Sequence, residues 1–159
     1  METQETLSDY ERERGKPVPS KLHSIAQKNL ILALHAFEPP YTVFSELTLD
    51  LNGRDITPDL CMYRDMVVDF THDEVRIPDP PILAIEIASP TQGIQGLVQK
   101  VQALLQNGVQ SCWLVQPQLK TITVFTGDMA STTYSDGTVP DPVTDISVAI
   151  ADVFTSTGG

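Results

Sequence analysis

Apolar residues recur at helical spacing in two segments of the chain. The first runs from Leu22 to Phe37 and ends at Pro39-Pro40, and the second runs from Ile94 to Leu105 and ends at Asn107-Gly108. Spacings of three and four residues place apolar side chains on one face of a helix. Proline, or a pair such as Asn-Gly, commonly follows a helix end. The sequence therefore predicts two amphipathic helices.

Shorter segments with alternating or continuous apolar residues predict β-strands. Residues 41–51 alternate, which is typical of a strand with one buried face. Asn52-Gly53 is a turn pair, and the polar, proline-rich residues 64–81 predict a loop. Residues 82–89 are apolar on both faces apart from Glu86, as in a central strand covered on both sides. Further strands are predicted at residues 56–64, 111–117, 121–127 and 145–154.

This order of helices and strands indicates an α/β fold, a central sheet with a helix on each face. The helix between residues 82–89 and 111–117 would cross over the sheet, which makes those two strands parallel. The length of 159 residues suits one domain. We expect that domain over residues 20–155, with a polar N-terminal arm at 1–19 and a loose tail at 156–159.

The charge balance argues against unassisted binding to a polyanion. The chain has 21 acidic and 10 basic residues, a formal net charge of -11. A nucleic-acid partner would therefore need a local basic patch or bound metal ions. Half of the basic residues do gather near the N-terminus, where a solvated arm is the simpler interpretation: Arg12, Arg14, Lys16, Lys21 and Lys28.

Two further features concern the cellular setting. No apolar run approaches the roughly 18 residues of a membrane span. The N-terminal residues lack the apolar core of a secretory signal peptide, so a cytoplasmic location is expected. Cys61 and Cys112 lie in apolar, strand-like segments without a CxxC partner, which favours reduced, buried thiols over a disulfide or a zinc site.

Glu86 is the residue whose placement most needs an explanation. It interrupts the apolar segment PPILAIEIASP, and on its face of the strand it is flanked by Ala84 and Ala88, which leave open space beside it. Burial of a lone carboxylate costs several kcal/mol unless a cation or hydrogen bonds compensate for it. The sequence therefore predicts a partner for Glu86.

Three other residues are candidates for the same site. Asp59 lies near the start of a neighbouring strand, and Glu46 lies on the polar face of the strand at 41–51. Lys100 lies on the flank of the second helix, from which its long stem can reach the sheet. Carboxylates with one lysine suit a hard divalent cation such as Mg²⁺. A buried Glu86–Lys100 ion pair without chemistry is the alternative, and the pattern alone leaves both open.

Four motifs resemble the Uma-two family of restriction-endonuclease-like proteins, a branch of the PD-(D/E)xK nuclease superfamily. They are TPD at 57–59, IEIASPT at 85–91, Lys100 and NGVQSCWLVQP at 107–117. The resemblance implies a restriction-endonuclease-like core, a central mixed β-sheet flanked by helices. It also implies an endonuclease that hydrolyses DNA phosphodiester bonds with Mg²⁺ or Mn²⁺. Asp59, Glu86 and the Ile87 carbonyl would be its metal ligands.

The resemblance also assigns roles to residues around this core. Lys100, on the helix, would stand in for the lysine that the superfamily usually has at the position of Ala88, and would position the nucleophile and balance charge. Glu46 and His23 would be accessory residues, and a homodimer acting on DNA would be expected by analogy. Leu104, where the family commonly has tyrosine, departs from the pattern. The second hypothesis is an inactive nuclease-fold binding or assembly module with a structural Glu86-Lys100 pair.

Overall fold

The computed structural model describes residues 18–156, so most of the expected arm at 1–19 and residues 157–159 of the expected tail lie outside the described residues. Its main element is a six-stranded mixed sheet in the order β1-β4-β5-β6-β7-β8. All neighbouring strands are antiparallel except β5 and β6, which are parallel as expected. The strands are β1 (Tyr41–Ser45), β4 (Leu60–Arg64), β5 (Leu83–Ile87), β6 (Ser111–Gln116), β7 (Thr121–Thr126) and β8 (Ala130–Tyr134).

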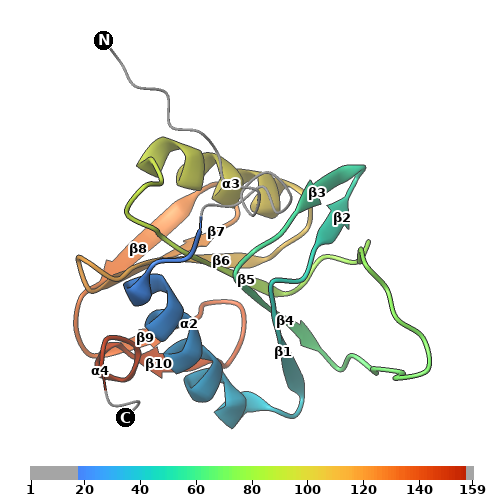
Figure 1. The fold of residues 1–159 in the computed structure, drawn as a ribbon, viewed down its shortest axis with the longest axis horizontal. Coiled ribbons are helices and arrows are strands. Elements are labelled where there is room, and N and C mark those ends of the chain that lie inside the picture. Colours follow the sequence, from blue (N-terminus) through green and yellow to red (C-terminus); the bar gives the residue numbers. More distant parts are fainter. Residues whose placement is uncertain (1–17, 157–159) are drawn as a thin grey trace.

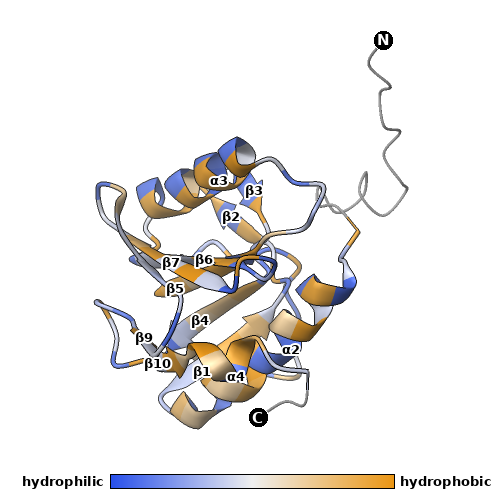
Figure 2. Ribbon diagram, turned by 90° about the vertical axis from the view of Figure 1, so that its left-hand side faces the viewer, coloured by the Kyte–Doolittle hydropathy of each residue, from blue (hydrophilic) through white to orange (hydrophobic). Residues whose placement is uncertain are grey.

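Two long helices cover opposite faces of this sheet, as Figures 1 and 2 show. They are α2 (Lys21–Leu34), extended by the 3-10 turn η1 (His35–Phe37), and α3 (Ile94–Gln106). Both lie where the apolar periodicity predicts them. The short helix α4 (Ile150–Val153) packs beside α2, where the Asn29 side-chain amide donates to the Val153 carbonyl at 2.8 Å.

The central strand β5 separates two hydrophobic clusters. Leu83, Ile85 and Ile87 are fully buried with the apolar face of α2, while Ala84 is buried with the apolar face of α3. The α2 cluster includes Trp113, whose indole N–H donates to the buried Asp141 at 2.9 Å. The prediction of a central strand covered on both sides is confirmed, and β5 lies between β4 and β6.

The two strands predicted at 41–51 and 56–64 are each divided in the structure. Residues 49–51 and 54–56 form a separate hairpin of β2 (Leu49–Leu51) and β3 (Arg54–Ile56), joined by the expected Asn-Gly turn. The chain changes direction at Glu46, which has a φ of 52°. A single strand cannot contain this left-handed conformation, so Val43 packs in the α2 cluster while Leu49 packs in the α3 cluster.

The C-terminal part departs further from the sequence expectation. The single strand predicted at 145–154 is instead β10 (Ser147–Ala149) followed directly by α4. Strand β10 pairs with β9 (Thr138–Pro140), which was not predicted, nor was the edge strand β8. Four of the five residues of β8 are exposed, so no alternating apolar pattern marks this strand.

The two cysteines lie where their apolar surroundings predict them. Cys61 and Cys112 are both buried free thiols. Between residues 18 and 156 no helix combines the length and the apolar character that a membrane crossing requires.

Candidate active site

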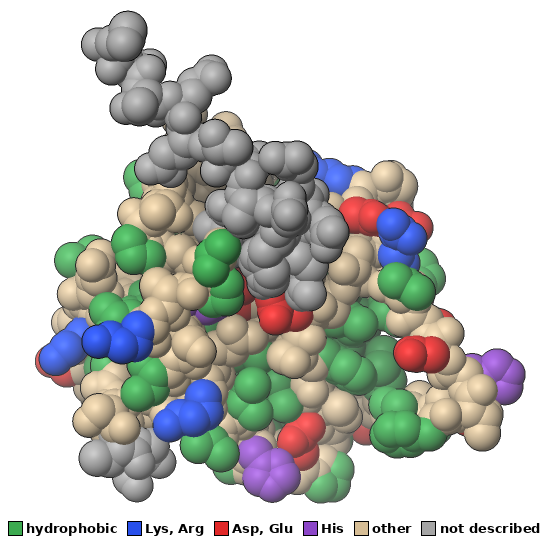
Figure 3. Space-filling model, viewed as in Figure 1, with side chains coloured by type: hydrophobic (Ala, Val, Ile, Leu, Met, Phe, Trp, Pro, Cys, Tyr) green, Lys and Arg blue, Asp and Glu red, His purple; other side chains and the backbone are tan. Residues whose placement is uncertain are grey.

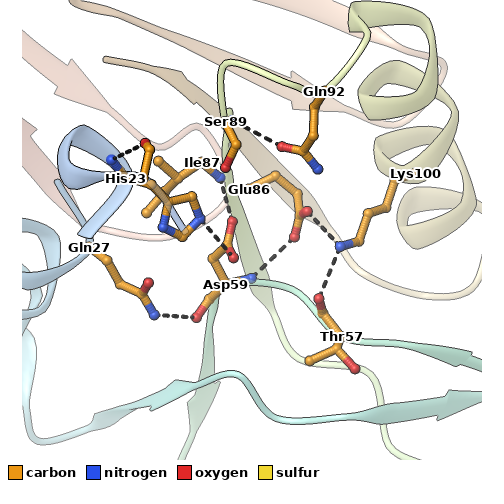
Figure 4. Close-up of polar contacts among 10 residues, drawn as sticks. His23, Gln27, Thr57, Asp59, Glu86, Ile87, Ser89, Gln92 and Lys100 are labelled. Atoms are coloured by element: carbon orange, nitrogen blue, oxygen red, sulfur yellow. Dashed lines mark hydrogen bonds and ion pairs between the residues drawn. The ribbon is translucent and has the colours of Figure 1, made fainter. Parts of the chain in front are cut away.

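The pairing of β4 with β5 brings the two candidate carboxylates together. Leu60 pairs with Ile85, so the antiparallel register places the preceding residue, Asp59, opposite the following one, Glu86. Both are deeply buried, with exposed fractions of 2% and 1%. The Asp59 backbone N–H donates to Glu86 Oε2 at 3.2 Å. Residues 27 positions apart in the sequence thus become direct neighbours (Figure 4).

Lys100 reaches Glu86 from helix α3. Its Nζ lies 2.7 Å from Glu86 Oε1 and also donates to the Thr57 carbonyl at 2.9 Å. The lysine side chain is 23% exposed, whereas the glutamate side chain is 2% exposed. The ammonium is therefore at the border of the site, and the carboxylate is inside it. The expected convergence of Lys100 on Glu86 is present.

Asp59 is held from the other side, by β5 and helix α2. Its Oδ2 accepts the Ile87 backbone N–H at 2.7 Å, and its Oδ1 lies 3.1 Å from His23 Nε2. The Gln27 side-chain amide donates to the Asp59 carbonyl at 3.2 Å. His23 and Gln27 are four residues apart and therefore on one face of α2. The carboxylate thus has donors from two elements.

The first turn of α2 fixes the position of His23. Ser20 is the N-cap, and its Oγ accepts the His23 backbone N–H at 3.2 Å. The imidazole is buried, and its Nδ1 has no hydrogen-bond partner within residues 18–156. Because Nε2 faces a carboxylate, it can donate a hydrogen to Asp59. The helix N-terminus also places the positive end of its dipole near Asp59.

Glu46 is near the site, but on a turn rather than on a strand face. The alternation of residues 41–51 predicts it on the polar face of a strand, whereas the structure places it between β1 and β2. Its backbone N–H donates to the Asp59 carbonyl at 3.0 Å, so it helps to fix the chain at Asp59. The resemblance names the Ile87 carbonyl as a metal ligand. The contact of Ile87 with the Asp59 carboxylate is made by its backbone N–H instead.

A buried thiol completes the surroundings of Glu86. Cys112 lies on β6, next to β5, and burial raises the pKa of its thiol well above the ordinary value, with a smaller contribution from the negative charge of Glu86. Burial also raises the pKa of the Cys61 thiol, to about 12. A thiol with a raised pKa is a poor nucleophile and a poor metal ligand at neutral pH. The thiols therefore serve as small apolar groups here.

Sequence reasoning missed three groups that hold the site in place. Gln27 supports Asp59, the Thr57 carbonyl supports Lys100, and Gln92 accepts the Ser89 backbone N–H at 3.0 Å near the end of β5. The four-residue spacing from His23 could have indicated Gln27. No sequence signal indicates a backbone carbonyl as the second partner of a lysine.

The donor set suits a hard divalent cation in its chemistry. Two carboxylates and a nearby backbone carbonyl are oxygen ligands, and Mg²⁺ commonly uses one or two carboxylates together with waters and substrate phosphate. Among residues 18–156, no group of three or more His, Cys, Asp and Glu side chains is arranged to hold a metal ion. A cation here would therefore depend on Asp59 and Glu86, with water or substrate as the remaining ligands.

The described surface does not supply a continuous basic patch in the view of Figure 3. The Lys and Arg side chains on this face stand in separate groups among polar and hydrophobic side chains. Arg76 pairs with Asp55 at 2.7 Å, and Arg64 lies 3.6 Å from Asp65. These pairs leave less positive charge for phosphate contacts.

The fold is that of a nuclease-like α/β protein. It is similar to the crystal structure of "a putative nuclease belonging to DUF820" from Anabaena variabilis, with a TM-score of 0.76 and 22% sequence identity over 87% of this chain and 83% of that chain. The model of the Uma2 family, described as "Putative restriction endonuclease", matches residues 1–152. The chain belongs to this family, as its motifs indicate. A search of curated proteins gives no match.

Proposed function

We propose that the protein is a metal-dependent endonuclease that hydrolyses DNA phosphodiester bonds. The observation that carries the proposal is the meeting of Asp59, Glu86 and Lys100, which lie just before β4, on β5 and on α3. Two carboxylates buried side by side are costly to retain for stability alone. Membership in a family described as "Putative restriction endonuclease" supports a catalytic role for these three residues.

Each residue has a role in the proposed mechanism. Asp59 and Glu86, with the Ile87 carbonyl, would hold Mg²⁺ or Mn²⁺, which when bound supplies Lewis acidity and lowers the pKa of a coordinated water. Lys100 would orient the attacking water and balance the charge that develops on the phosphate. His23 orients Asp59 by its contact at 3.1 Å, and Glu46 supports the same residue through its backbone.

The setting of the activity is part of the proposal. We assign it to the unit at residues 20–155, in a cytoplasmic protein that acts as a homodimer. Cutting both strands of a duplex favours two active sites, and closed two-fold dimers are the commonest soluble oligomers. Two buried free thiols accord with a reducing compartment.

The test is cleavage of plasmid, linear and single-stranded DNA in the presence of Mg²⁺ or Mn²⁺. Asp59→Asn and Glu86→Gln should each lower the cleavage rate by about a hundredfold or more, because each removes a charged ligand. Asp136→Asn is the matched control, since Asp136 is exposed and lies in the loop between β8 and β9. Absence of cleavage by the wild type, together with absence of metal binding in calorimetry, would refute the proposal.

A second candidate has its own supporting observation. Lys100 contacts both Glu86 and the Thr57 carbonyl, so two of the three donors of its ammonium tie α3 to β5 and to the chain before β4. An inactive nuclease-fold binding or assembly module would retain this tie without any metal. In that case Glu86→Gln should destabilise the fold, and neither the wild type nor the variant should cleave DNA.

A further inference from the structure

A pocket of about 280 Å³ opens next to the candidate active site. Ala88 and Ser89, which closely follow Glu86 along the chain, belong to its lining. Ser20 and Leu22, at the start of α2, line it as well. The pocket thus adjoins strand β5 and helix α2, the two elements that hold Asp59. If a ligand is bound at the two carboxylates, the part of that ligand next to the bound group can reach this pocket.

Gln92 and Ser89 give the pocket oriented polar groups. Gln92 Oε1 accepts the Ser89 backbone N–H, which fixes the orientation of the amide and leaves its NH₂ group directed elsewhere. This NH₂ group has no hydrogen-bond partner within residues 18–156. Ser89 is only 6% exposed, and its hydroxyl likewise has no partner among these residues. Figure 4 shows Ser89 and Gln92 together at the end of β5, beside Glu86.

The remaining lining distinguishes between the possible ligands. No charged side chain from residues 18–156 lines the pocket, so it does not match a phosphate group. Gln116 and Gln118 add amide groups, and Ile94, Leu97 and Leu119 add apolar surface. Amides match the donors and acceptors on the edge of a nucleobase, and apolar side chains can pack against the faces of a base held outside the stack. The volume lies near the lower end of the ~300–1,000 Å³ typical of small-molecule sites.

We propose that this pocket binds one unpaired nucleobase of the substrate, from the nucleotide next to the cleaved bond. The proposal rests on the proposed nuclease function and names the substrate class of that site. A base can enter the pocket only when it is not paired, and extrusion costs least where the strand is already single. DNA single strands, flaps and ends are therefore cut faster than intact duplex, in which the base must first be flipped out of the stack.

Binding of mononucleotides tests the pocket without requiring cleavage. With the full chain in the absence of divalent metal, calorimetry should detect dAMP or dTMP at millimolar concentration. Deoxyribose 5-phosphate, which lacks the base, should bind about tenfold more weakly or not at all. Ile94→Trp should abolish nucleotide binding by filling the pocket, because Ile94 lines it and is 55% exposed. Leu32→Trp, at a 57% exposed position of α2 outside the pocket, is the matched control.

Cleavage provides the second test. An oligonucleotide with an abasic site beside the scissile bond should be cut about tenfold more slowly than the intact strand by the wild type. The Ile94→Trp variant should cut the intact and the abasic oligonucleotides at the same low rate. Equal binding of dAMP and deoxyribose 5-phosphate, or no nucleotide binding, would overturn the pocket proposal even if DNA is cleaved. Base-dependent binding without any DNA cleavage would leave the pocket in place and refute the nuclease.

Discussion

Replacement of Lys100 by methionine separates a metal site from a structural ion pair. Methionine keeps the length and apolar stem of lysine but removes the ammonium that lies 2.7 Å from Glu86 Oε1. Removing one partner of a buried ion pair costs about 3–5 kcal/mol, because the other charge remains buried. Since the lysine is 23% exposed and water reaches this side of the site, the lower end, about 3 kcal/mol, is expected.

Thermal and urea unfolding would measure this loss. For a chain of 159 residues, a destabilisation of about 3 kcal/mol corresponds to a decrease in Tm of about 6–12 °C. Lys28→Met is the matched control, because Lys28 is an exposed lysine on α2 and its loss should change the free energy of unfolding by less than about 0.5 kcal/mol. The double variant Glu86→Gln, Lys100→Met leaves no unpaired charge and should be more stable than Lys100→Met alone.

Addition of Mg²⁺ or Mn²⁺ then distinguishes the two functions. If Asp59 and Glu86 bind the cation, it replaces the missing ammonium and stabilises the Lys100→Met variant by about 2.7 kcal/mol at a concentration a hundred times the Kd. The double variant, which lacks the Glu86 charge, should gain much less. A Lys100→Met variant as stable as Lys28→Met would refute the reasoning on the ion pair. A destabilised variant that gains nothing from metal would leave the structural pair as the better account.

Three further predictions concern the fold around the site. Gly108→Ala should destabilise the protein by about 1–3 kcal/mol in urea unfolding, because Gly108 has a φ of 104° and a Cβ would lie 2.8 Å from the Pro80 side chain. Gly96→Ala in α3 is the control, and it should be neutral or stabilising because a Cβ there meets nothing within 4 Å. Equal effects of the two substitutions would contradict backbone strain at Gly108. Asp141→Ala should cost about 3 kcal/mol in urea unfolding, since the carboxylate accepts from the Trp113 indole and from the backbone N–H groups of Val143 and Thr144. A loss below about 1 kcal/mol would show that the buried indole finds another acceptor. Burial raises the pKa of the Cys61 thiol from 9.0 to about 12, so the folded state holds this proton more tightly than the unfolded state does. The contribution of this proton to the free energy of unfolding is complete below pH 9 and is lost as the pH rises toward 12. Urea unfolding at about pH 8 and about pH 10 should show this decline in the free energy of unfolding, at most about 1.4 kcal/mol per pH unit for one thiol. The decline should be smaller in Cys61→Ala. If the free energy of unfolding of this variant falls with pH as steeply as that of the wild type, Cys61 is not the cause.

Hydrophobic periodicity predicts the elements that build the centre of the fold. Both long helices and β5 are marked by apolar residues whose spacing reports burial directly. The crossover through α3 then makes β5 and β6 parallel, which the sequence order already implies. The convergence of Lys100 on Glu86 follows from the same facts, because a helix packed on the sheet brings its flank over the neighbouring strand.

The parts that could not be predicted depend on contacts between distant residues or on backbone conformation. The left-handed conformation of Glu46 divides a segment whose alternation would suit a single strand. The edge strand β8 has almost no buried face, so its pairing with β7 leaves no apolar pattern. Residues 150–153 have the sequence IADV, whose apolar residues suit a short strand and a helical turn equally well. Their packing against α2, including the bond from Asn29 to Val153, decides in favour of the helix.

The two carboxylates of the candidate site are held by different helices on opposite faces of the sheet. Asp59 is held through His23 from α2, and Glu86 is held through Lys100 from α3. The site is therefore complete only when both helices are packed on the sheet, so its formation is coupled to folding of the core. Ala88 leaves space beside Glu86, and what matters for a buried carboxylate is where the ammonium lies in space, whichever element carries it.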